Sequence, residues 1–226
     1  MVDQKGVLKY EYYEGRKKNL ALKYRLARRT KEVLKGIEEY NRHKLDSLLD
    51  IGTADARMLE MLNNELSVQN AVGIDFSADL LHTNPNKDLF LVQADAVTLP
   101  FKNNSFDVLV AMAVIEHVTD PSQMMRECWR VIRDEGICIL STPDPFFEHI
   151  ATKIGHLKED QHNETFSLSN LKSLVERAGF HIVLAEKFMI SPIGFPFEDG
   201  IERVMRIVGL DFLLLNQLLI GKKSEQ

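Results

Sequence analysis

Four short apolar stretches decide the fold, and they read LLDIGTADA (48–56), AVGIDFS (71–77), LVQADAVTLPF (91–101) and SFDVLVAMAVIEHV (105–118). Each apolar run is short enough to be a buried parallel strand. Each run stops at an acidic or small residue, where the carboxyl end of a strand would meet a ligand. The sequence therefore predicts an α/β fold with a ligand site along one edge of a parallel sheet.

The rest of the chain continues this alternation of strand and helix, which builds a parallel sheet. Strands are expected at about 45–50, 70–75, 89–93, 106–112, 136–142, 181–190 and 213–222. Helices are expected at about 17–40, 54–66, 77–82, 121–132 and 167–179, with Ser77, Asp120 and Ser167 or Ser169 as N-caps. The expected architecture is a Rossmann-like, seven-stranded, mostly parallel sheet with an antiparallel last strand and helices on both faces.

Two parts are expected along the chain. Residues 1–44 would form a basic helical cover, and residues 45–226 the ligand-binding domain. Irregular insertions at about 143–165 and 190–209 carry several aromatic and histidine side chains. Because they would lie over the carboxyl end of the sheet, they are expected to form a mobile lid over the ligand site.

The composition fits one enzyme domain. The chain has 226 residues, of which 45% are hydrophobic and 27% charged, as in ordinary globular proteins. No signal peptide is expected, because the N-terminus lacks an apolar run. The most apolar segment, 204–221, is interrupted by Arg206 and Asp211 and is a poor membrane span. Cys128 and Cys138 lie in no CxxC motif, so we expect no metal site and a reducing, cytoplasmic location.

Positive charge is concentrated near the N-terminus. Residues 1–44 carry 13 Lys or Arg and 6 Asp or Glu, a local charge of +7 in a chain whose net charge is −5. Apolar residues near one face of the expected helix are Leu22, Leu26, Val33, Ile37 and Tyr40. Two interpretations are open. The helix is either a platform for an anionic acceptor, nucleic acid or acidic lipid, or a cover packed across the domain with a solvated basic outer side.

The first and second strands supply the best candidate ligand contacts. Gly52 lets the main chain approach a bound molecule closely, and Asp50 can organise that loop through hydrogen bonds to backbone amides. Asp75 ends the second strand, where a carboxylate can accept hydrogen bonds from both hydroxyls of a ribose. Phe76 follows and can lie on an adenine face. Asp75 could instead cap the helix expected near Ser77.

The third strand supplies candidate contacts to an adenine. Asp95 can accept a hydrogen bond from the adenine amino group, and the Ala96 amide can donate to the ring. The alternative for Asp95 is an Asx-turn at the end of the strand, which would explain that residue alone but not the ordered set of motifs.

These four motifs, in this order, resemble the class I S-adenosylmethionine-dependent methyltransferases, especially the small-molecule branch with the ubiquinone-biosynthesis enzymes. The resemblance covers roughly residues 45–185. It implies S-adenosylmethionine as cofactor and a small or medium-sized acceptor, methylated on an O, N or C atom. It also implies that Met112 touches the methionine end of the cofactor and that Arg28, in YRLARR (24–29), reaches its carboxylate.

Two features of the sequence bear on catalysis. Ala54 and Ala56 stand where the family usually has glycine, and alanine fits there at small cost if φ is negative. His117 follows the fourth strand, and an imidazole can remove a proton from a hydroxyl near neutral pH, as in some sugar methyltransferases of this branch. Alternatively, Glu116 and His117 only form hydrogen bonds with the loop backbone. A base is not always needed, since acidic phenols and amines can be methylated without one.

Other protein classes fit less well. A nicotinamide-dependent oxidoreductase should have a third glycine in its phosphate loop, but this chain reads GTADAR (52–57). The sequence AMAVIEH (111–117) replaces the Asn/Asp-Pro-Pro-aromatic run of enzymes that methylate base amines, which argues against a nucleic-acid acceptor. A methyltransferase-like scaffold protein without turnover also remains open because of Ala54 and Ala56. Oligomeric state is not predicted.

Overall fold

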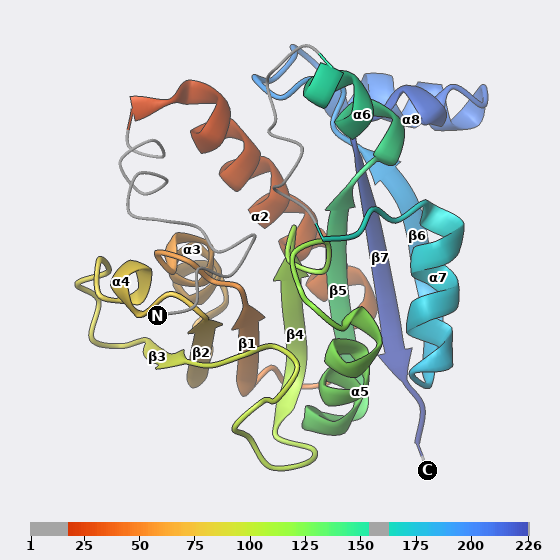
Figure 1. Cartoon of the computed structure of the whole chain (residues 1–226). Helices are drawn as coiled ribbons and strands as arrows, with labels where there is room; N and C mark the ends of the chain where they lie inside the picture. The colour runs from red at the N-terminus through yellow and green to blue at the C-terminus, as the bar shows by residue number, and fades with distance from the viewer. Residues whose placement is uncertain (1–17, 154–162, 226) are drawn as a thin grey trace.

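The computed structural model describes residues 18–153 and 163–225, and Figure 1 shows them built around one twisted sheet. The strands are β1 (Ser47–Ile51), β2 (Asn70–Asp75), β3 (Phe90–Gln93), β4 (Phe106–Met112), β5 (Ile132–Pro143), β6 (Phe180–Phe188) and β7 (Asn216–Lys223). Their order is β3-β2-β1-β4-β5-β7-β6, and β7 runs antiparallel to both β5 and β6. The other pairings are parallel. The predicted architecture is therefore confirmed.

Helices cover both faces of the sheet. They are α2 (Leu20–Tyr40), α3 (Arg57–Leu66), α4 (Ala78–Leu81), α5 (Pro121–Val131), α6 (Pro145–Lys153), α7 (Leu168–Arg177) and α8 (Glu198–Ile207), and a 3₁₀ turn, η1, spans Asp211–Leu213. On one face, Val33 of α2 and Leu59 of α3 share a core with alternate side chains of the central strands. On the other face, Met124 of α5 and Leu171 of α7 pack on the remaining side chains.

Helix starts follow the chemistry expected from the sequence at two places. The Asp120 carboxylate accepts the Gln123 N–H at 2.8 Å, with Pro121 in the first turn. The Ser167 hydroxyl accepts the Asn170 N–H at 3.2 Å. At the third place, the Ser77 side chain makes no capping bond. Instead the carboxylate of Asp75 accepts the backbone N–H of Ser77.

The expectation that the two insertions are irregular is wrong for their described parts. The first contains α6 and the second contains α8, while residues 154–162 lie outside the described part of the chain. In Figure 1, α6 and α8 lie together beyond the carboxyl ends of β4 and β5. The segment before β7 is the turn η1 rather than strand, so β7 begins three residues later than the expected 213.

Two further observations concern the described residues. None of their helices is both long enough and apolar enough to cross a membrane. Cys128 and Cys138 are buried free thiols on α5 and β5, and burial raises the pKa of the Cys138 thiol well above its ordinary value.

Candidate cofactor site

The loop after β1 is shaped around Gly52. This residue is exposed and has a φ of +69°, and a Cβ built on it would lie 2.4 Å from the Val114 side chain. Its conformation favours glycine, and its proximity to the Val114 side chain leaves little room for a Cβ. Asp50, only 3% exposed, accepts the Thr53 hydroxyl at 2.6 Å. This bond ties Asp50 to the loop through a side-chain hydroxyl, and the predicted bonds to backbone amides remain a prediction.

Ala54 and Ala56 adopt the left-handed conformation, with φ of +52° and +55°. The condition under which alanine would fit at small cost, a negative φ, is therefore not met at either position. The reason is that the loop must turn sharply so that the backbone N–H of Ala54 reaches Asp75. The left-handed conformation costs an alanine on the order of 1–2 kcal/mol. The loop therefore keeps the family's glycine-like path although it has side chains at both positions.

Asp75 joins the loops that follow β1 and β2. Its Oδ2 accepts the Ala54 N–H and its Oδ1 accepts the Ser77 N–H, each at 2.8 Å. Both carboxylate oxygens of Asp75 therefore lie between the loops after β1 and β2, where the sequence predicts the ribose hydroxyls. Phe76 beside it is 41% exposed, which leaves its ring accessible. Both features expected from the sequence, capping and ligand access, are compatible in this geometry.

Asp95 forms the Asx-turn that the sequence left open. Its Oδ1 accepts the Val97 N–H at 3.1 Å, and its carbonyl accepts the Thr98 N–H at 3.1 Å. Asp95 and Ala96 are both half-buried beyond the end of β3. The turn fixes the direction of the carboxylate and of the Ala96 amide. The adenine contact remains a prediction at these two positions.

The segment after this turn is held by an ion pair on α5. Glu127 accepts the Leu99 N–H at 2.8 Å, while Arg130 donates to the carbonyls of Leu99 and Phe101 at 3.0 and 2.6 Å. Glu127 and Arg130 also bond each other at 2.8 Å. The hydrogen bond from Arg130 holds the pKa of Glu127 below its ordinary value, against the effect of burial. This pair anchors the LPF sequence that follows the adenine-binding candidates.

A pocket of about 90 Å³ lies between the β1 loop and helix α2. Its walls are Asp50, Gly52, Thr53, Met58 and Met112 on one side and Leu22, Arg25, Leu26 and Arg29 on the other. Ligand pockets are usually at least about 300 Å³. A ligand of nucleoside size therefore needs α2 to move outward. Helix α2 lies over this pocket, a position compatible with the second interpretation of the basic N-terminal segment.

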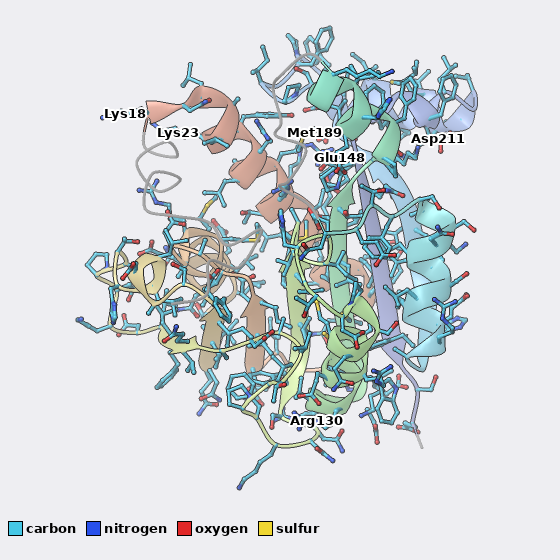
Figure 2. All side chains as sticks on the ribbon, viewed as in Figure 1. Lys18, Lys23, Arg130, Glu148, Met189 and Asp211 are labelled. Atoms are coloured by element: carbon cyan, nitrogen blue, oxygen red, sulfur yellow. The ribbon has the colours of Figure 1, made fainter. Side chains whose placement is uncertain are left out.

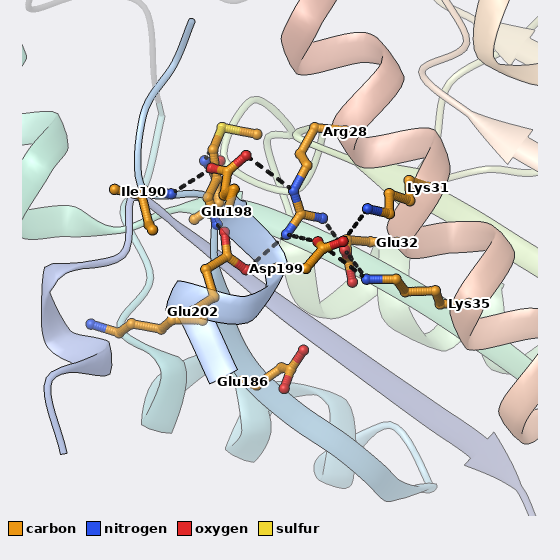
Figure 3. A network of polar contacts seen from close by, with 12 residues as sticks. Arg28, Lys31, Glu32, Lys35, Glu186, Ile190, Glu198, Asp199 and Glu202 are labelled. Carbon is orange, nitrogen blue, oxygen red and sulfur yellow. Dashed lines mark hydrogen bonds and ion pairs between the residues drawn. The ribbon is translucent and has the colours of Figure 1, made fainter. Parts of the chain in front are cut away.

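Arg28 does not line this pocket, although it was the arginine chosen from the sequence. Its guanidinium bonds Glu32 and, at 2.7 Å, Glu202, with Glu198 and Asp199 within 3.7 and 3.6 Å. Figure 3 shows these carboxylates around Arg28 between α2 and α8. Successive helix residues are turned by about 100°, so Arg28 points to α8 while Arg29 and Arg25 point to the pocket.

The carboxylates around Arg28 also hold the chain that leads into α8. Glu202 accepts the Met189 N–H at 2.7 Å and Glu198 accepts the Ile190 N–H at 2.9 Å. Burial raises the pKa of Glu198, although the Ile190 N–H opposes this. On the exposed side, Lys31 bonds Asp199 and lowers the pKa of that carboxyl. Arg28 is thus the central cation of a latch that joins the cover helix to α8.

His117 lies in the turn after β4 and is half-buried. Its backbone N–H donates to the Val114 carbonyl at 2.8 Å, and its carbonyl accepts the Asn163 side-chain amide at 2.5 Å. The carbonyl of the buried Glu116 accepts the Asn163 N–H at 2.8 Å. The turn therefore connects the end of β4 to the chain leading into α7. Both roles considered for His117, base and loop residue, agree with this position.

The sequence interpretation missed four pocket residues, namely Arg25, Arg29, Thr53 and Met58. One signal was available for the arginines. Arg25 and Arg29 are four residues apart and flank Leu22 and Leu26, which were assigned to the inner face of the helix. The resemblance instead directed attention to the neighbouring Arg28. Thr53 carried no signal beyond its place in the loop.

The residues of this edge fit S-adenosylmethionine. The Nε atom of Arg25 is buried and has no hydrogen-bond partner among the described residues, so a cation faces the pocket where a carboxylate can bind. Gly52 offers exposed backbone, and Asp75 and Asp95 offer acceptors at successive strand ends. This set matches an amino-acid tail, a ribose and an adenine in order along the sheet edge.

Comparisons with known proteins point to one class. A family model described as a methyltransferase domain matches residues 49–140. The demethylmenaquinone methyltransferase of Lactobacillus johnsonii is 26% identical over 61% of this chain and 67% of its own length. The mitochondrial ubiquinone biosynthesis O-methyltransferase of Saccharomyces cerevisiae is 32% identical over 42% of this chain, but this stretch is only 33% of its own length. These sequence matches indicate a methyltransferase.

A solved structure agrees over a longer stretch. An S-adenosylmethionine-dependent methyltransferase from Archaeoglobus fulgidus has a TM-score of 0.66 with 20% identity, covering 95% of this chain and 100% of that one. This likeness establishes the common fold. The sequence matches support a class I S-adenosylmethionine-dependent methyltransferase of the branch that resembles the ubiquinone enzymes. S-adenosylmethionine is the cofactor.

Proposed function

We propose that this protein transfers a methyl group to a small or medium-sized acceptor, with the cofactor held along the edge formed by the loops after β1, β2 and β3. The observation that carries this proposal is the convergence of Gly52, Asp75 and Asp95 at successive carboxyl strand ends. When bound, S-adenosylmethionine supplies an electrophilic methyl group on a sulfonium. The protein supplies alignment and exclusion of water.

Each residue of the edge has a distinct part in this proposal. Asp75 accepts from the ribose, while its bonds to Ala54 and Ser77 keep the carboxylate in place. Asp95 and the Ala96 amide contact the adenine. Arg25, whose Nε has no partner among the described residues, binds the methionine carboxylate of the cofactor. This contact was first assigned to Arg28. These assignments rest on geometry and charge, and each is testable by substitution.

The acceptor is proposed to enter beside α2. A second pocket, of about 570 Å³, lies on the other side of this helix and is lined by Tyr24, Phe195 and Phe197 together with charged residues of the latch. Because α2 is the wall between the two pockets, outward movement of the helix would connect them. Residues 195–200, which include Phe195 and Phe197, belong to the second insertion. The position of this pocket therefore supports the expectation that this insertion covers the acceptor.

Calorimetry with S-adenosylhomocysteine tests the cofactor site. We expect micromolar binding by the full chain and weaker binding by Arg25→Leu, with Lys23→Leu on the exposed side of α2 as the matched control. Transfer of a labelled methyl group to a pool of phenols, amines and quinols then tests turnover. Absence of cofactor binding would contradict the site, and binding without transfer to any acceptor would favour the scaffold alternative.

A further inference from the structure

Helix α8 buries acidic side chains and exposes apolar ones, which is the reverse of an ordinary surface helix. Its acidic side chains Glu198 and Glu202 are 8% and 1% exposed, because they bond Arg28 and the backbone before α8. Its apolar side chains Val204 and Ile207 are 57% and 77% exposed. A surface helix normally buries its apolar face and shows its charges. The outer face of α8 is therefore built to meet something other than water.

The exposed apolar surface continues beyond the helix. We name as the apolar cap the side chains of Ile201, Val204, Ile207, Val208, Phe212 and Leu213, all exposed. They come from α8, from Val208 directly after it and from η1, and α8 and η1 pack against each other. Exposed apolar side chains that gather on neighbouring elements are typical of an interaction site. Glu198 and Glu202 hold the base of the cap on the body, so the cap is a fixed feature of the fold.

The charge near the cap indicates its partner. Of the six Lys or Arg in residues 18–31, Lys18 and Lys23 are exposed and belong neither to the latch nor to the smaller pocket. Figure 2 shows these two lysines and Asp211 of η1 in the upper half of the molecule, the lysines on one side and Asp211 on the other, whereas Arg130 lies at the bottom. An apolar surface with basic residues in the same half of the molecule fits a lipid bilayer that carries negative charge.

A second copy of this chain is a poorer partner for the apolar cap. A two-fold contact places the same patch of each copy against the other. It would place cap against cap and give Lys18 and Lys23 no anionic surface to meet. A bilayer with anionic lipids attracts the lysines and receives the apolar side chains together.

We propose that the apolar cap docks this protein on the surface of an anionic lipid bilayer, with α8 and η1 lying in the interfacial plane. Such helices sit with their apolar side at the boundary between headgroups and acyl chains. This attachment is peripheral and needs no membrane-spanning helix. It does not depend on methyl transfer, and it sets the mouth of the larger pocket, beside Phe197, near the bilayer.

Sedimentation with vesicles tests the proposal on the full chain. We expect the wild type to bind vesicles of phosphatidylcholine mixed with phosphatidylglycerol and to bind pure phosphatidylcholine less. Val204→Glu with Ile207→Glu should lower the partition coefficient at least about tenfold, as expected from losing the burial of these side chains. Lys18→Gln with Lys23→Gln should remove the preference for anionic lipid and its dependence on salt.

The matched control is Phe90→Glu on the edge strand β3, where the side chain is 59% exposed. It adds the same kind of charge to another apolar surface site, and it should bind vesicles like the wild type. The proposal fails if the wild type binds neither vesicle, or if Phe90→Glu loses as much binding as the cap variant. Sedimentation equilibrium without lipid gives a further check. A wild-type dimer that Val204→Glu dissociates would assign the cap to self-association instead.

Discussion

The Asp75 carboxylate accepts the backbone N–H of Ala54 at 2.8 Å, so the loop after β1 is fixed by the residue that ends β2. We predict that Asp75→Ala weakens binding of S-adenosylhomocysteine by about 1.5–3 kcal/mol, the scale of lost charge-assisted hydrogen bonds. Calorimetry measures this. Asp79→Ala, which removes an exposed carboxylate from α4, is the control. Equal affinity of Asp75→Ala and the wild type would remove the ribose assignment.

A second prediction concerns the left-handed alanines. In a strand, glycine is less stable than alanine by about 0.5–1 kcal/mol, so Ala111→Gly in β4 should lower the free energy of unfolding by at least that amount. Ala54→Gly should cost less, because relief of the φ of +52° offsets the loss. Urea denaturation compares the two variants. A larger loss in Ala54→Gly than in Ala111→Gly would contradict a strained loop.

Arg28 should be critical for stability. Arg28→Met leaves Glu32, Glu198 and Glu202 buried without their shared cation, and breaking a buried ion pair in this way costs about 3–5 kcal/mol. Lys31→Met removes an exposed cation of the same cluster and should cost less than about 1 kcal/mol. Denaturant unfolding of both variants decides the matter, and equal losses would mean that the latch is not organised around Arg28.

The Glu127–Arg130 pair should make stability sensitive to acid. The hydrogen bond from Arg130 lowers the pKa of Glu127 from its ordinary 4.5. The stabilisation is therefore present above pH 4.5 and is lost as the pH falls through the lowered pKa. Because both side chains are partly exposed, the effect should be at most about 1 kcal/mol.

Glu127→Gln should show a shallower loss of unfolding free energy with falling pH than the wild type. Glu65→Gln, on the exposed surface of α3, removes the same charge and serves as the control. If both variants follow the wild-type pH profile, the pair is not a source of acid sensitivity.

His117 is predicted to act as the general base for a hydroxyl acceptor. His117→Ala should then lower the single-turnover rate by about 10²-fold or more, with unchanged cofactor affinity. His82→Ala, which removes an exposed imidazole after α4, should turn over normally. A rate for His117→Ala within about threefold of the wild type, far below the usual contribution of a base, would leave His117 as a residue of the turn.

The strands were predictable because their information is local. Runs such as those of β2 and β4 are apolar, short and closed by polar or small residues, and the structure has these two at the expected 70–75 and 106–112. Gly52, Asp50 and Met112 were also found from the sequence and meet in the pocket. Asp75 and Asp95 lie at their strand ends, but their ligand contacts remain predictions.

Features that depend on tertiary packing were not predictable. The rotation of α2 about its axis decides that Arg25 and Arg29, rather than Arg28, face the pocket. A rotation of about 100°, the angle between successive helix residues, would change which arginines face it. Helix α8 was missed because its buried side chains are glutamates, whose burial depends on Arg28 from a segment 174 residues away in the sequence. The positive φ of Ala54 follows from a bond to Asp75, not from its own residue type.

The position of β7 between β5 and β6 has a consequence for how the chain folds. Of the seven strands β7 comes last in the chain, yet it lies inside the sheet, and β6 pairs with it along the register Phe180–Phe188. Until β7 is synthesised, β5 has an open edge and β6 has no neighbour in the sheet. The cofactor edge built by β1 to β4 can form early, whereas α8, held between β6 and β7 in the chain, can reach its final place only at the end. Binding competence should therefore precede completion of the cap during synthesis.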